Sequence, residues 1–193
     1  MQEIGLEEKI FSALERIHTS SRSALNRTGH EHSLSPLQAQ ILHFAHRRNT
    51  ASVSQLAEQL RVTKPTISDA IAALLTKKLI KKTASKEDAR GYSITLTAKG
   101  SNEAVLIASY ATPFLDSVNT LSTPQKQALW DALINLLRTM ESQRLIPHQR
   151  MCFSCKYFEQ NKKAEGYYCR LMEAPLCIDE LRIDCNEHEC IAS

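Results

Sequence analysis

The sequence predicts a mainly α-helical fold with one small β-hairpin, followed by a short cysteine-rich module. Through most of residues 6–143, apolar residues recur every three or four positions, which is the period of an amphipathic helix. Residues 79–83 and 92–96 instead alternate between apolar and polar side chains, as β-strands do. None of the six cysteines lies before residue 152. We therefore place the two parts at residues 1–146 and 147–193.

Composition limits the classes of function. The 193 residues allow one substantial domain and a small appendix. No apolar run approaches the roughly 20 residues of a membrane span, and the N-terminus lacks a signal-peptide pattern, so we expect a cytoplasmic protein. There is no glycine-rich phosphate loop, nucleophile elbow or His-Glu-x-x-His motif, and we expect no enzyme.

The net charge of +3 is unevenly distributed. Residues 51–100 hold nine basic and four acidic side chains, whereas residues 152–193 hold five basic and eight acidic ones. A concentration of positive charge is what phosphate contacts require. We therefore expect residues 51–100 to face nucleic acid and the acidic C-terminal part to avoid it.

Residues 63–75 predict a helix whose exposed face is polar at its N-terminal end. Thr63 is a favourable N-cap, and Pro65 in the first turn loses no hydrogen bond there. The apolar positions share one stripe: Ile67, Ile71, Leu74 and Leu75. A helix that reads bases presents its N-terminal residues to the major groove. We therefore expect DNA contacts from the four polar residues there: Lys64, Thr66, Ser68 and Asp69.

A second, shorter helix is expected at residues 53–60, with Ser54 as its cap. The turn Arg61-Val62 joins it to the helix at 63–75. Two helices connected in this way form a helix-turn-helix motif.

The two predicted strands follow the helix-turn-helix directly and have a charged segment, 85–91, between them. A basic hairpin in this place is a wing, and the fold is then a winged helix-turn-helix. Further DNA contacts are expected from Lys82, Lys86 and Arg90. Taken alone, these basic residues would also fit a solvated hairpin. A protein-docking surface is the other alternative, but the exposed helix face is not apolar.

Long helices are expected at both ends of the winged domain. Residues 6–28 form one amphipathic segment. Residues 101–143 form another, which Pro113 should kink or end near residue 112 and which restarts at Thr123. These helices expose more apolar surface than one chain can cover, so we expect a homodimer that uses them.

Residues 34–100 resemble the MarR family of winged helix-turn-helix regulators. The resemblance is carried by residues 34–38 (Leu-Ser-Pro-Leu-Gln), 53–57 (Val-Ser-Gln-Leu-Ala), 63–75, 88–90 (Asp-Ala-Arg) and 96–100 (Leu-Thr-Ala-Lys-Gly). It implies a homodimeric repressor on a pseudo-palindromic operator, with a possible small-molecule effector. It also implies that Arg90 approaches the minor groove while Asp88 holds its guanidinium. One departure is Lys78, where the family usually has glycine, and this predicts an altered turn.

The resemblance does not extend to the cysteine-rich module. Cys152-x-x-Cys155 is a spacing that holds one metal ion between two thiolates. In a reducing cytosol, six cysteines in about forty residues suggest metal ligation before disulfides. We expect four ligands, Cys152, Cys155, Cys169 and Cys185, with Cys177, Cys190 and His188 as alternates.

Zinc and an iron–sulfur cluster both fit this ligand set. The thiolates suit zinc, which we place slightly first, while cysteines on separate segments and the flanking aromatic residues suit a cluster. The sequence leaves open whether the centre senses metal or redox state, transfers electrons, or only holds the module together.

Overall fold

The structure is a computed structural model that describes residues 4–84, 92–161 and 166–191. Contacts divide the chain into two units, Met1–Ser117 and Val118–Ser193, and each is described here by itself. None of the described helices is both long enough and apolar enough to cross a membrane.

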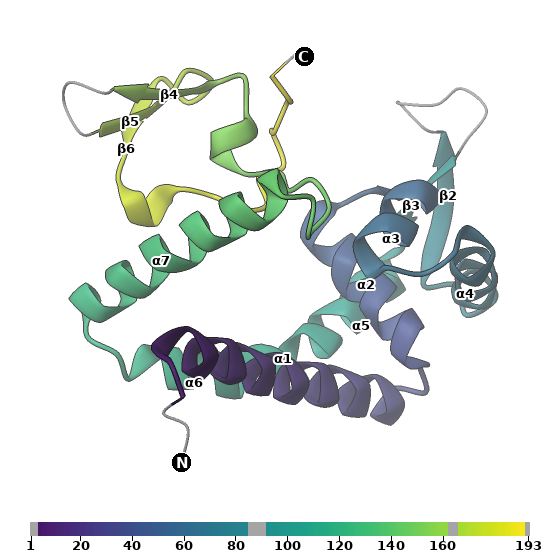
Figure 1. Cartoon of the computed structure of the whole chain (residues 1–193). Helices are drawn as coiled ribbons and strands as arrows, with labels where there is room; N and C mark the ends of the chain where they lie inside the picture. Colours follow the sequence, from purple (N-terminus) through teal and green to yellow (C-terminus); the bar gives the residue numbers. More distant parts are fainter. Residues whose placement is uncertain (1–3, 85–91, 162–165, 192–193) are drawn as a thin grey trace. The chain divides into compact units, whose positions relative to one another are not determined.

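The first unit is a set of helices around a small antiparallel sheet (Figure 1). Its strands are arranged in the order β1-β3-β2, with Ala51 opposite Ile94 and Ile80 opposite Leu96. The elements are α1 (Leu6–Glu31), α2 (Pro36–Arg48), β1 (Ala51–Ser52), α3 (Val53–Leu60), α4 (Lys64–Thr76), β2 (Ile80–Ala84), β3 (Tyr92–Leu96), α5 (Ala98–Ala108), the 3-10 turn η1 (Ser109–Ala111) and α6 (Thr112–Asn119). The predicted winged helix-turn-helix is confirmed.

The core of this unit fixes α4 against the helices and the sheet. Ile67, Ile71 and Leu74, the predicted stripe, are buried, whereas Leu75 is only half-buried. They share one cluster with buried side chains from α2, α3, β3 and α5: Ile41, Leu42, Leu56, Ile94 and Ile107. The polar face of α4 is therefore turned away from the core.

Local signals explain most of the helix starts. Ser35 and Gln38 form a capping box at α2, as the sequence predicts. At α3 the cap is Ser52, so the prediction of Ser54 was wrong. Ser52 Oγ accepts from the Gln55 amide at 3.2 Å, while Gln55 Oε1 accepts from the Ser52 amide at 3.0 Å.

The C-terminal ends of α1 and α4 can each be compared with the prediction. The first helix continues three residues past Thr28, to Glu31. Lys78 follows the C-terminal end of α4 with φ 58°, in the left-handed region that favours glycine. The altered turn expected at Lys78 is therefore present. Its backbone amide donates to Leu75 O at 2.9 Å.

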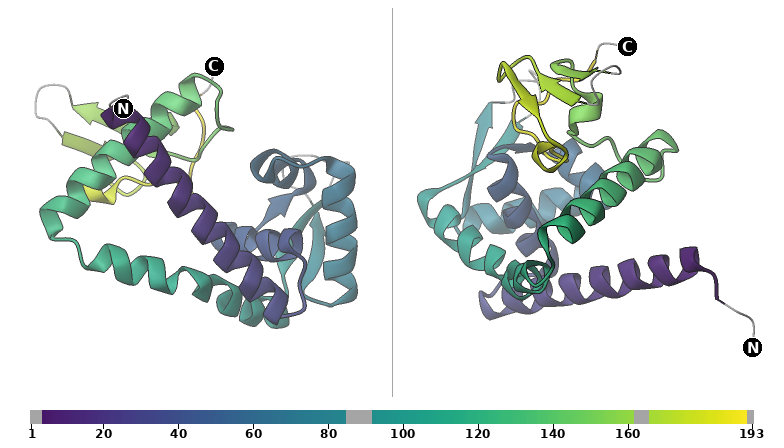
Figure 2. Two further views of the ribbon diagram at one scale, coloured as in Figure 1. Left: turned by 60° about the horizontal axis from the view of Figure 1, so that its bottom comes forward. Right: turned by 90° about the vertical axis from the view of Figure 1, so that its left-hand side faces the viewer.

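The second unit consists of one long helix and a small three-stranded sheet (Figures 1 and 2). In both figures the strands lie along one side of the helix. The elements are α7 (Thr123–Ser142), η2 (Cys152–Ser154), β4 (Phe158–Asn161), β5 (Gly166–Cys169), β6 (Ala174–Leu176) and η3 (Ile178–Glu180). The strand order is β4-β5-β6, and all pairs are antiparallel.

The helix α7 packs with the cysteine-rich segment, although we expected the boundary after it, at residues 146/147. Ile134 is fully buried in a cluster with Leu176 and Leu181. The indole Nε1 of Trp130 donates to Ile178 O at 2.9 Å, and the Arg138 guanidinium lies 4.7 Å from the centroid of the Phe153 ring. A short, cysteine-rich piece buries little apolar surface alone, and α7 supplies the missing face.

Candidate DNA-binding surface and metal sites

The N-terminal end of α4 presents the four polar residues that the sequence singles out. Lys64, Thr66, Ser68 and Asp69 are all exposed. Thr63 caps the helix by accepting from the Thr66 amide at 3.4 Å, and the two threonine hydroxyls are 2.8 Å apart. The structure therefore groups these residues on one accessible surface, and their contact with DNA remains a prediction.

The wing strands of the same unit also carry positive charge. Lys82 is exposed on β2, and its Nζ lies 4.2 Å from the centroid of the Tyr92 ring on β3. A cation–π contact of this kind restricts where the ammonium group can reach. Three further predicted residues, Lys86, Asp88 and Arg90, lie outside the described residues.

One lysine near the wing has a structural partner instead. Lys77 Nζ donates to Ser33 O at 2.5 Å and to Gln38 Oε1 at 3.0 Å, which ties the end of α4 to the start of α2. Its charge is therefore directed into the unit and not toward the polar end of α4.

All four cysteines of the predicted ligand set line one cavity of about 60 Å³ in the second unit. Cys152 lies in η2, Cys155 directly follows it, Cys169 ends β5, and Cys185 lies near the C-terminal end of the described chain. The rest of the wall is mainly apolar and aromatic, with Tyr157, Phe158, Leu171, Met172 and Leu176. Residues separated by up to 33 positions thus meet at one place.

Burial and the neighbouring thiols both affect the ionisation of Cys152. Burial is the main cause that raises the pKa of Cys152, and the neighbouring Cys185, Cys155 and Cys169 raise it further. The Arg182 amide, which donates to Cys152 Sγ at 3.2 Å, acts in the opposite direction. Cys152 therefore lies close enough to the other three cavity cysteines for their charges to affect it.

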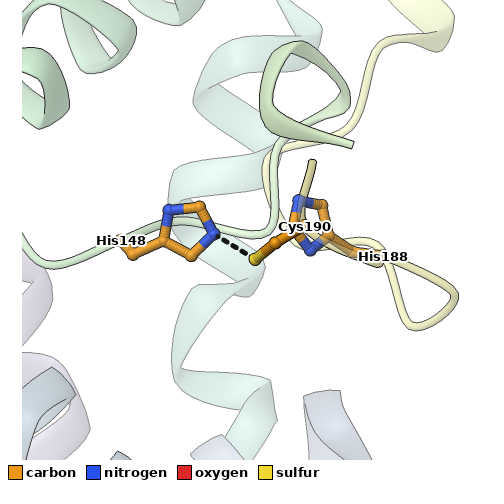
Figure 3. A group of neighbouring side chains, drawn as sticks. All are labelled: His148, His188 and Cys190. Atoms are coloured by element: carbon orange, nitrogen blue, oxygen red, sulfur yellow. Dashed lines mark hydrogen bonds between the residues drawn. The ribbon is translucent and has the colours of Figure 1, made fainter. Parts of the chain in front are cut away.

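The three alternate ligands lie elsewhere. Cys177 is exposed and caps η3, where its amide donates to Glu180 Oε2 at 2.7 Å. His188 and Cys190 lie with His148, and one ligand atom from each of the three falls within 4.8 Å of the others (Figure 3). His148 was not among the predicted ligands, and it lies about forty positions from its two neighbours.

Comparison with known proteins supports the first unit's fold. Residues 32–91 match the model of the MarR family. No curated protein sequence matches the chain.

Three solved structures illustrate the likeness. A MarR protein from Peptoclostridium difficile is 22% identical over 74% of this chain and 94% of its own, with a TM-score of 0.60. A MarR-family transcriptional regulator from Listeria monocytogenes, complexed with a 26mer DNA, is 20% identical over 75% of this chain and 93% of its own, with a TM-score of 0.59. The MepR–DNA complex of S. aureus is 22% identical over 67% of this chain and 97% of its own, with a TM-score of 0.53. Residues 32–91 therefore match the MarR family, and the chain shares the fold of these solved structures.

Proposed function

We propose that the protein is a MarR-type transcriptional regulator, most simply a repressor, that binds a pseudo-palindromic DNA operator as a homodimer. The observation that carries this proposal is the exposed polar end of α4, with Lys82 on the adjacent wing. The structures of similar fold that contain DNA add to this support.

In this proposal α4 enters the major groove by its N-terminal end. Thr66, Ser68 and Asp69 offer short donors and acceptors for base edges, while the ammonium groups of Lys64 and Lys82 suit phosphates. The predicted roles of Arg90 at the minor groove and of Asp88 as its support belong to the same hypothesis. Two copies would read half-sites about one helical turn, or roughly 10 bp, apart.

The proposed dimer uses the helices at the ends of the winged domain. Several large apolar side chains are exposed on α1, α5 and α6: Leu6, Ile10, Phe11, Ile17, Val105, Leu106, Leu115 and Val118. Ile10 is 49% exposed and Phe11 is 62% exposed, although both lie in a regular helix. Exposed apolar side chains in this number are typical of an interface, and a second copy would bury them.

The test is selection of binding sites from genomic DNA, followed by titration of the recovered site. Ser68→Ala should alter sequence preference, whereas Lys82→Ala should weaken binding to all sequences and reduce the slope of log K against log salt by about 1. Lys126→Ala, in the second unit, is the matched control and should change neither property. Recovery of no motif would contradict the proposal of a sequence-specific regulator.

We further propose that Cys152, Cys155, Cys169 and Cys185 hold a metal centre, and that an iron–sulfur cluster fits better than zinc. The mainly apolar and aromatic residues that line the cavity with these cysteines, among them Tyr157 and Phe158, carry this preference. Such residues would shield a cluster from solvent.

Absorption spectroscopy with iron, sulfide and zinc analysis of anaerobically purified protein tests this assignment. A cluster predicts iron and acid-labile sulfide together with a visible chromophore that Cys155→Ser removes. Zinc at the four thiolates, without iron or sulfide, would overturn the preference for a cluster. Protein without metal at these cysteines would overturn the metal centre itself.

A further inference from the structure

We infer that His148, His188 and Cys190 form a second metal site, for one zinc-like divalent ion, distinct from the four-cysteine cavity. The Nε2 atom of His148 lies 3.2 Å from Cys190 Sγ, and the centroids of the two imidazole rings are 5.5 Å apart. Figure 3 shows His148 on one segment of the chain facing Cys190 and His188 on another. Three ligand atoms already lie close enough for one ion to join them.

Both histidines are oriented by oxygen atoms outside the ligand group. His148 Nδ1 lies 2.5 Å from Glu141 Oε1, and this carboxylate is held on α7, where it is only 16% exposed and also accepts from the Gln149 amide at 3.1 Å. His188 Nε2 lies 3.0 Å from Ser154 Oγ. A histidine that binds metal characteristically gives its other ring nitrogen to such a partner, which fixes the ring and its tautomer.

The segment that carries His188 and Cys190 is also fixed by its backbone. Cys190 pairs with Cys155 in an antiparallel bridge. The amide of Ile191 donates to Ser154 O at 3.2 Å, and the amide of Lys156 donates to Glu189 O at 2.8 Å. Pre-organised ligands bind a metal ion at a lower conformational cost.

The two groups of ligands are separate in composition and in place. None of His148, His188 and Cys190 lines the four-cysteine cavity. Two imidazoles and one soft thiolate form a ligand set that suits Zn²⁺ in tetrahedral geometry. His148 is 47% exposed, so water has access to a fourth position. The second site therefore has the ligand pattern of an open zinc site, whereas the ligands proposed at the cavity are four thiols.

The test measures zinc in the purified full-length protein by elemental analysis, and zinc affinity by competition with a chromophoric chelator. His148→Ala and Cys190→Ser should each lose one zinc per chain relative to the wild-type protein, with no loss of the metal bound by the four-cysteine cavity. Cys177→Ser removes an exposed thiol of the same unit that belongs to neither group, and it should retain the full metal content.

Two milder variants keep the test decisive if the first ones fold poorly. Glu141→Gln should still bind zinc, but with roughly 10- to 100-fold lower affinity, because only the orienting carboxylate is changed. Cys190→His replaces one good zinc ligand by another and should restore the zinc that Cys190→Ser loses. Equal zinc content and affinity in the wild-type protein, Cys190→Ser and Glu141→Gln would overturn the site and leave a His148–Cys190 hydrogen bond.

Discussion

His43, on α2 of the winged-helix unit, is a titratable side chain kept neutral by its surroundings. Burial is the largest cause that lowers its pKa, to about 4, and the nearby charges of Arg47 and His46 lower it further. The ring lies edge-on to Tyr110, with centroids 5.3 Å apart. In the unfolded chain the same group titrates near its ordinary value of 6.5.

This difference predicts a loss of stability in acid. Between pH 6.5 and 4 the unfolded chain binds a proton that the folded chain does not, so the free energy of unfolding falls as the pH falls. The full shift corresponds to about 3 kcal/mol, which solvent around the partly exposed ring reduces to about 2 kcal/mol. Urea titrations of His43→Phe should lack this part of the pH dependence, while His18→Asn, an exposed control, should keep it. An unchanged dependence in His43→Phe would show that other groups cause the loss.

We expect the winged-helix unit to become more stable when Lys78 is replaced by glycine. A side chain with a φ of 58° is strained, whereas glycine adopts this conformation without a steric penalty. We expect Lys78→Gly to raise the free energy of unfolding by about 1 kcal/mol. Lys78→Ala, which keeps the β-carbon, should be nearly neutral in a parallel denaturation series. A gain in both variants would assign the effect to the lysine side chain and not to the backbone.

At the scale of elements, Gly100 determines how closely α5 approaches the turn before β2. A β-carbon at this position would lie 1.7 Å from Leu79 O. The same turn is held by Thr97, whose amide donates to Leu79 O at 3.0 Å and whose hydroxyl accepts from the Gly100 amide at 2.9 Å. There is no flexible side chain that could move aside, because the clash is with backbone.

We therefore expect Gly100→Ala to destabilise the winged-helix unit by about 3 kcal/mol. Chemical denaturation measures this change, and Ser101→Ala, at the exposed neighbouring position, is the control that should stay within about 0.5 kcal/mol of the parent protein. A mild effect of Gly100→Ala would mean that α5 can shift away from Leu79.

The sequence predicted most elements of the first unit because each has a local signal. Helical stripes, the Ser35 capping box and the alternating strands all act within a few residues of the chain. The error at Ser54 was avoidable, since Ser52 and Gln55 stand at the spacing of a capping box. The strain at Lys78 was predicted from the family resemblance, because the family usually has glycine at this position.

The second unit was harder to predict because its contacts join distant residues. No local sequence signal indicates that Trp130 and Ile134 face the cysteine-rich segment and not another helix. The four cavity cysteines could be selected from their order and spacing. His148 could not, since its association with residues 188 and 190 depends on the tertiary fold. Neither the periodicity nor the composition of a sequence indicates which distant segments will pack together.

At the scale of the whole molecule, α7 connects the proposed metal centres to the proposed dimer. One side of this helix packs on the cysteine-rich segment through Ile134, which is fully buried. Two of its other apolar residues, Leu129 and Leu136, are 43% and 40% exposed, so they are available to a second copy. Loss of metal would loosen the packing on one side of this helix, and the proposed dimer would use the other side.

This arrangement predicts that removal of the four-cysteine centre weakens dimerisation and, through it, binding to a two-fold operator. A ligand changes an equilibrium only through its different affinity for the two states, so the metal-loaded protein should favour one dimer geometry. Sedimentation and operator titration should be measured for metal-loaded, metal-free, oxidised and Cys155→Ser protein. Leu136→Glu should weaken the dimer without loss of metal, which separates the two causes. Equal operator affinity in all metal states, with the winged-helix unit still folded, would assign the cysteine-rich segment a purely structural role.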